Sequence, residues 1–147
     1  METVGYLAPE TPEAVEEAYA DCEPIARELT REIVLATGID SASYHDMMTT
    51  EVIEAAQAVY FSSVLRIHTG SREEFSEWIA SSPYTEEAVH REGSPNVDQI
   101  AWHVSRATDQ IVAATYHQQR EAALSSLRRI VWGRLYAEMV HGVATDE

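Results

Sequence analysis

A change of hydrophobic period after the segment SSPYT constrains the fold of this chain more than any other feature. Apolar residues recur at helical spacing before it, and they alternate with other residues in VDQIAWHVSRATDQIVAATYH, which spans 97–117. Two such runs joined by the polar segment SRATD are typical of a β-hairpin. We therefore predict a hairpin near 98–116, with Ile100, Trp102 and Val104 on one face.

The first forty residues predict helix. Thr11 is an expected N-cap, and Pro12 follows it at the first helical position. Pro24 is expected to restart or kink this helix, and the second part then ends at Gly38. This second part has apolar residues at helical spacing. They are Ile25, Leu29, Ile33 and Ala36.

Three further helices are predicted before the hairpin. A short one lies in IDSASYHDMM, and a longer one in TTEVIEAAQAVYFSSVLRIHTG begins after Thr49 or Thr50 and closes at Gly70. SREEFSEWIA forms the third, because Ser71 and Glu74 have the spacing of a capping box.

The remaining segments complete an α+β fold. EEAVHRE, residues 86–92, is a possible strand, and 118–141 predicts one long helix. We therefore expect an N-terminal helical layer, a small antiparallel sheet and a long C-terminal helix. Since no repeat or linker divides the chain, 1–147 is predicted to be a single globular domain.

The charge of the chain is unusually negative. It has 25 acidic residues against 10 basic ones, and all ten are Arg because no Lys occurs. Residues 1–100 hold 20 acids and 5 Arg, whereas 101–147 hold 5 of each. Such a surplus repels itself unless salt at about 1 M or more shortens the screening length to about 3 Å. This favours a halophile cytosol, and an acidic protein from a GC-rich genome is the alternative.

Several sites are excluded by residues that the chain lacks. No run of 18 apolar residues and no basic leader occurs, which predicts a cytoplasmic protein without a membrane segment. The six glycines are too widely spaced for a phosphate cradle, and the absence of Lys excludes a P-loop or a Schiff base. We therefore predict no cofactor.

The single cysteine, Cys22, is expected to be a small core residue.

The histidines do not predict a metal site. Glu87 to His90 and Glu138 to His141 each match E-x-x-H, but about one such match is expected by chance in so acidic a chain. In the hairpin, His103 lies opposite Val112 or Ala113, about 13 to 20 Å along the strands from His117. One metal cannot bridge that separation. We expect His103 to be a solvent-facing strand residue.

The C-terminal helix has the most informative surface. Its apolar residues cover an arc approaching 180°, whereas a surface helix normally needs about 100°. One flank is expected to meet the Ile100, Trp102 and Val104 face of the sheet. The other flank meets either the N-terminal helices or a partner, which could be a second copy of the chain.

Trp, Tyr and Arg are the residue types that anchor interfaces. The predicted interaction surface therefore consists of Trp102, Arg128, Trp132 and Tyr136. Within it, Arg128 or its neighbour Arg129 is expected to lay its stem on apolar surface and to pair with a carboxylate.

Two functions remain open. The first is a non-enzymatic interaction or regulatory module that uses the neutral, aromatic and Arg-bearing C-terminal third. The alternative is a small cofactor-independent enzyme that uses His and carboxylate acid–base chemistry, including His103 and the Tyr44–His45 pair. The missing cofactor motifs favour the first, whereas a buried His–carboxylate pair in a pocket would favour the second.

Nucleic-acid binding is disfavoured. The helix that would read DNA, TEVIEAAQAVYFSSVLRIH, has two acids and one Arg, but phosphate neutralisation needs a basic face. An RNA contact would have to use Arg120, Arg128, Arg129 and Arg134.

The order and character of five segments resemble a family of small haloarchaeal proteins known only as a domain of unknown function. They are APETPEAVEEAY, GSREEFSEW, NVDQIAWH, VAATY and LRRIVWGRLY. The resemblance covers nearly the whole chain. It implies a halophilic origin and transfers no site residues.

Overall fold

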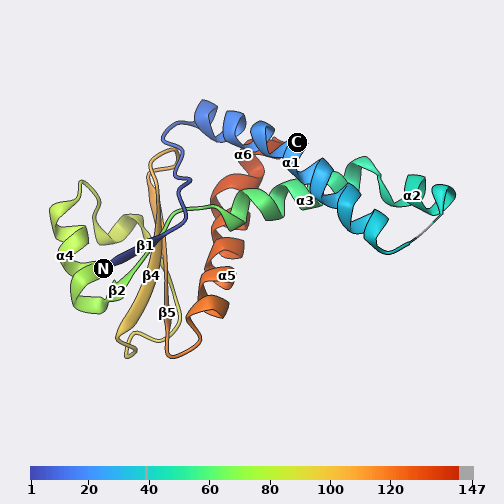
Figure 1. The fold of residues 1–147 in the computed structure, drawn as a ribbon. Helices are drawn as coiled ribbons and strands as arrows, with labels where there is room; N and C mark the ends of the chain where they lie inside the picture. Colours follow the sequence, from blue (N-terminus) through green and yellow to red (C-terminus); the bar gives the residue numbers. More distant parts are fainter. Residues whose placement is uncertain (39, 143–147) are drawn as a thin grey trace.

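A five-stranded sheet with helices on both faces organises the molecule (Figure 1). The computed structural model describes residues 1–38 and 40–142. The sheet order is β1-β2-β4-β5-β3. The strands are β1 (Glu2–Val4), β2 (Ile67–Ser71), β3 (Val89–Glu92), β4 (Gln99–Ser105) and β5 (Gln110–Tyr116).

The helices confirm the predicted α+β class. The C-terminal helix is long, as predicted, and is built from α5, one turn of π-helix and α6. The helical segments are α1 (Pro12–Ala36), α2 (Ser41–Met47), α3 (Thr50–Ser63), α4 (Arg72–Ser81), a 3₁₀ turn (Glu86–Ala88), α5 (Arg120–Val131), the π turn (Trp132–Tyr136) and α6 (Ala137–His141).

The hairpin of β4 and β5 is confirmed, with His103 opposite Val112. The sheet around it is larger than predicted, because β1 and β2 also join it. It is mixed rather than wholly antiparallel, since β3 pairs with β5 in parallel. The parallel pair is possible because a long connection, containing the whole of β4, separates β3 from β5.

The predicted helix from Thr50 to Gly70 was too long. The observed α3 ends at Ser63, and its N-cap is Thr49. The following residues form β2, in which Ile67 and Thr69 are buried and His68 between them is half-buried. In a strand, alternate side chains point to the same face, so Ile67 and Thr69 are buried together. A helix continued through these residues would not place them on one face in this way.

The predicted break at Pro24 was also wrong in part, because α1 continues through it from Pro12 to Ala36. Proline removes the hydrogen bond to the carbonyl four residues earlier, here that of Ala20. Both Pro24 and Ala20 are exposed, so water can hydrate this carbonyl. The helix is also stabilised by its buried face, which packs against the rest of the chain both before and after the proline. That face includes Cys22, which is buried as expected, and Ala26.

Both faces of the sheet are covered by helix, in three layers (Figure 1). On one face Ile100 and Trp102 pack with Phe75 and Ile79 of α4. This corrects the predicted packing of the Ile100 and Trp102 face against the C-terminal helix. The opposite face, which includes Val112, packs with α5 instead.

The second flank of the C-terminal helix packs on the N-terminal helices. Trp132 stacks on Tyr19 of α1 with ring centroids 5.5 Å apart, and it meets Phe61 of α3 edge-on at 5.5 Å. Tyr136 also contacts the Phe61 ring, at 5.5 Å. Within one chain, this flank is therefore core. Beyond it, α2 and the adjoining ends of α1 and α3 project away from the sheet (Figure 1).

None of the helices in the described ranges combines the length and the apolar character needed to cross a membrane.

Candidate functional site

A groove of about 490 Å³ lies between α3 and α5, at the side of the C-terminal helix. It exists because α3 presents small side chains there, among them Ala55, Ala58 and Ser62. The hydroxyl of Ser62 donates to the Ala58 carbonyl within its own helix, so this donor does not need a hydrogen-bond acceptor from a ligand. Val59 lines the same groove and is 68% exposed. Val59 therefore adds an exposed apolar contact to the groove.

The charge of this α3/α5 groove differs from that of the rest of the molecule. Arg128 and Arg129 line it, and no Asp or Glu does. Four other concave sites on the described residues each have at least one carboxylate in their lining. On a chain with a net charge of −15, the groove is therefore a local positive site.

Arg128 has a structural role in this position. Its Nε and Nη2 atoms donate to the carbonyl oxygen of Leu65, at 3.3 and 2.9 Å. This carbonyl lies just beyond the C-terminal end of α3, where a cation also interacts favourably with the helix dipole. The expected pairing with a carboxylate is not seen for Arg128 or Arg129 among the described residues. Partial burial lowers the pKa of Arg128, which remains a cation.

Trp132 forms part of the wall of the groove. It is half-buried: its ring packs on Tyr19 and Phe61, and the side chain also lines the groove. Packing on two aromatic rings fixes its orientation, so a ligand in the groove would meet a rigid apolar wall. Of the four residues predicted for an interaction surface, Arg128 and Trp132 are thus the two that line a concave site.

The other two predicted surface residues, Trp102 and Tyr136, are both 0% exposed. Trp102 lies under α4 with Phe75, and Tyr136 points toward β4. They contribute to the core of the chain, because both faces of the sheet are covered by helix. The sequence pattern does not reveal this second covering layer.

His103 is also fully buried, which corrects its expected position facing solvent. Its Nδ1 lies 2.8 Å from the Arg66 carbonyl oxygen and its Nε2 lies 2.7 Å from the Tyr136 hydroxyl. A ring N–H at Nδ1 therefore donates to the carbonyl, and Nε2 accepts from the tyrosine. Burial lowers the pKa of His103 to about 4 and raises that of Tyr136 to about 12. Both groups are neutral, and within the described structure His103 lines none of the five concave sites.

The remaining histidine patterns do not converge. His45 and Tyr44 lie on α2, where their rings are 5.8 Å apart and His45 is exposed. The two E-x-x-H units lie on different elements, the first across the 3₁₀ turn into β3 and the second on α6. Among residues 1–38 and 40–142, no group of three or more His, Cys, Asp or Glu side chains has a metal-binding arrangement.

An exposed apolar stripe on α1 was not identified from the sequence as a surface. Ile25, Leu29 and Ile33, which are four residues apart, are 42%, 48% and 65% exposed. They lie beside the face that packs on α3, toward the projecting end of the helix (Figure 1). Their helical spacing predicted a helix without indicating which of its faces is buried. Only the tertiary arrangement shows that α3 packs on the neighbouring face, which includes Cys22, Ala26 and Thr30, and leaves this stripe exposed.

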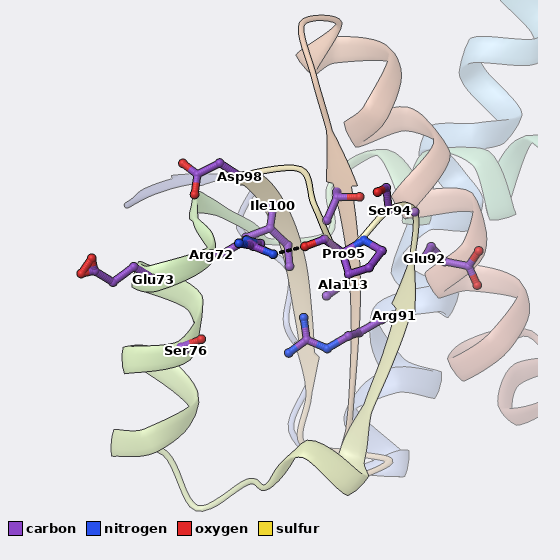
Figure 2. A pocket seen from close by; sticks show the side chains of 12 residues that line it. Arg72, Glu73, Ser76, Arg91, Glu92, Ser94, Pro95, Asp98, Ile100 and Ala113 are labelled. Atoms are coloured by element: carbon purple, nitrogen blue, oxygen red, sulfur yellow. Dashed lines mark hydrogen bonds between the residues drawn. The ribbon is translucent and has the colours of Figure 1, made fainter.

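A second hollow, of about 700 Å³, lies on the opposite face of the sheet between α4 and β3 (Figure 2). Its walls include Arg72 of α4 and Arg91 of β3. Sequence reasoning missed it because its parts come from separate segments and form no motif.

Comparison with known proteins gives one match. A model of a family of unknown function (DUF5809) matches residues 6–137. Neither the curated proteins nor the solved structures provide a match.

Proposed function

The chain belongs to the DUF5809 family, a family of unknown function, and we propose that it is a non-enzymatic interaction module whose binding surface is the α3/α5 groove. The observation that carries this proposal is the lining of the groove. It combines exposed Val59 and rigid Trp132 with two Arg side chains that form no ion pair with a carboxylate among the described residues. Aromatic and Arg side chains are enriched in protein interfaces, where they often contribute most of the binding energy.

The partner that fits this lining is a helix with an apolar stripe flanked by acids. The exposed stripe of α1 (Ile25, Leu29 and Ile33) has this chemistry. At about 100° per residue, three carboxylates lie along the side of the stripe that faces away from α3. They belong to Asp21, Glu28 and Glu32. We therefore assign the groove to the α1 stripe of a second copy.

The resulting dimer would be symmetric. Each copy would insert its stripe into the groove of the other, so every contact would occur twice. Arg128 and Arg129 of one copy would then face the carboxylates of the other. These opposite charges would favour one orientation of the two copies over others. The stripe and the groove together would cover apolar side chains that the single chain leaves exposed.

We further propose that the module acts as a single domain in a cytosol of high salt. The supporting feature is the net charge of −15 on 147 residues with no Lys. At molar salt the self-repulsion of the acidic surface is screened, while short contacts between groove and stripe are screened less.

The experiment is a comparison of oligomeric state by light scattering. Leu29 and Leu35 are both 48% exposed on α1, but only Leu29 belongs to the stripe. Wild type and Leu35→Ser should be dimers, whereas Leu29→Ser should dissociate about tenfold or more readily, because it loses an apolar contact twice per dimer. A monomeric wild type, or equal dissociation of the two variants, would contradict the assignment of this partner.

A further inference from the structure

We infer that the hollow between α4 and β3, here called the α4/β3 cleft, binds a small monocarboxylate with an apolar body. The cleft measures about 700 Å³, which is within the range of small-molecule sites. Figure 2 shows it open between the helix on one side and the edge strand on the other, with β4 and β5 behind. It lies on the opposite face of the sheet from the α3/α5 groove, so this inference does not depend on the proposed dimer.

The floor of the cleft is apolar and rigid. Ile100 of β4 and Ala113 of β5 form it, and each is 1% exposed because the surrounding side chains pack closely around it. The end wall is the turn after β3. Gly93 has a φ of +88°, and a Cβ there would lie 2.3 Å from the Thr115 hydroxyl oxygen. Only glycine lets this turn approach β5 so closely.

Two guanidinium groups enter the cleft from opposite walls. Arg91 extends from β3 toward α4 (Figure 2). Its guanidinium carbon lies 5.0 Å from the centre of the Phe75 ring. Its Nη2 donates to Glu86 at 2.8 Å, which holds the side chain in place from outside the cleft. Arg72 donates through Nη1 to the Pro95 carbonyl. A guanidinium has five N–H donors, so each group keeps donors for a carboxylate.

The remaining charges limit what can bind. Glu73, Glu92 and Asp98 also line the cleft, so its lining holds three carboxylates against two guanidiniums. In Figure 2 Asp98 and Arg91 lie on opposite sides of the floor residues. A polyanion such as a nucleotide would be repelled by these three groups. A single carboxylate can instead meet Arg91 while its apolar part contacts the exposed ring of Pro95, which also lines the cleft.

The test uses three probes at the KCl concentration that keeps the chain folded. They are 3-phenylpropanoate, 3-phenylpropylamine and inorganic phosphate. The amine has the same apolar body with a positive charge instead of the carboxylate, and phosphate is an anion without an apolar body. Backbone amide shifts measured by NMR should change saturably at 72–76 and 91–98 with 3-phenylpropanoate. The amine and phosphate should leave them unchanged at the same concentration. Equal or stronger binding of phosphate or of the amine, or no saturable change with the carboxylate, would overturn the inference.

Variants locate the binding. Arg91→Gln should weaken 3-phenylpropanoate about tenfold or more, because a hydrogen bond to a charged group is lost. Ser76→Phe places a ring in the cleft from an exposed position on α4 and should abolish binding with the fold retained. Arg106→Gln, an exposed Arg outside the cleft, serves as the control and should bind as wild type does. Unchanged binding to Ser76→Phe would show that the ligand lies elsewhere.

Discussion

At the scale of single residues, the pair of His103 and Tyr136 links the sheet to the C-terminal helix. Both side chains are 0% exposed, and the hydrogen bonds that His103 makes to Arg66 and Tyr136 suit a neutral imidazole. The Tyr136 hydroxyl donates to Nε2, and the Nδ1–H of His103 donates to the Arg66 carbonyl oxygen. Protonation of Nε2 would remove its ability to accept and would place a charge in the core. The pair therefore makes the stability of the chain depend on pH.

The direction of this pH dependence follows from comparing the pKa of His103 in the folded and unfolded chain. An unfolded His103 takes up a proton as the pH falls through about 6.5, whereas the folded one has a pKa of about 4. Between these values the unfolded chain binds more protons, so folding stability is lost as the pH falls. The full loss is on the order of 3 kcal/mol, and about 1 kcal/mol should be lost between about pH 7.5 and about pH 5.5.

Urea denaturation of wild type and His103→Gln at these two pH values measures this loss. The variant should be less stable at the higher pH, because it disturbs a buried hydrogen-bonded pair, and it should lose less on acidification. Histidines that both proteins share, such as His68, cancel in the comparison. Equal losses in the two proteins would contradict the neutral buried His103.

The position of His103 shows how far the sequence predicts a single residue. Its strand and its opposite residue, Val112, could be predicted from the alternation and the turn. Its burial could not. Ala101 and Val112 on its face give a weaker signal than Ile100 and Trp102, and the sequence does not show which face of the hairpin α5 covers.

At the scale of elements, starts of helices were more predictable than their ends. Thr11, Thr49 and Ser71 cap helices as expected, because a cap is a local hydrogen bond to nearby backbone. The end of α3 was missed because the residues after Ser63 fit either a helical or an alternating pattern. Pairing with β4 settles which pattern forms, and that partner is about thirty residues away in the sequence.

The π turn of the C-terminal helix was also not predicted, and it provides an element-scale test. Gly133 lies in this turn, and a Cβ there would meet nothing within 4 Å. Gly133→Ala should raise the free energy of unfolding by about 0.5 to 1 kcal/mol, since glycine is a poor helix former. Urea denaturation measures the change.

Gly5→Ala is the matched comparison. Gly5 has a φ of +82°, and a Cβ there would lie 2.3 Å from the Leu65 carbonyl oxygen that Arg128 also uses. This substitution should lower the free energy of unfolding by about 1 kcal/mol or more. A loss of stability in Gly133→Ala would show that the π turn needs glycine.

At the scale of the whole molecule, the candidate site was predicted in part. The C-terminal helix was expected to offer an aromatic and Arg-bearing surface, and Arg128 and Trp132 do line the α3/α5 groove. The other wall comes from α3, including Val59, and no local signal links these two helices. A groove between distant segments depends on tertiary packing, which a pattern along one helix cannot show.

Salt dependence follows from the charge of the whole molecule. Lowering KCl from multimolar to about 0.1 M lengthens the screening distance to about 10 Å and restores repulsion among the carboxylates of 1–100. The unfolding temperature should fall markedly, as followed by circular dichroism. An unfolding temperature that does not change over this range would contradict the proposed high-salt environment.

The central claim, that the groove of one copy holds the α1 stripe of another, is tested most directly by a charge exchange. Sedimentation equilibrium compares wild type, Arg129→Glu, Glu32→Arg and the double variant at the lowest KCl concentration that keeps the chain folded. Each single change should weaken the dimer by about 1 kcal/mol or more, since the pair occurs twice, and the double variant should regain most of it. A wild type that stays monomeric, or a double variant as weak as the sum of the two single changes, would contradict the account.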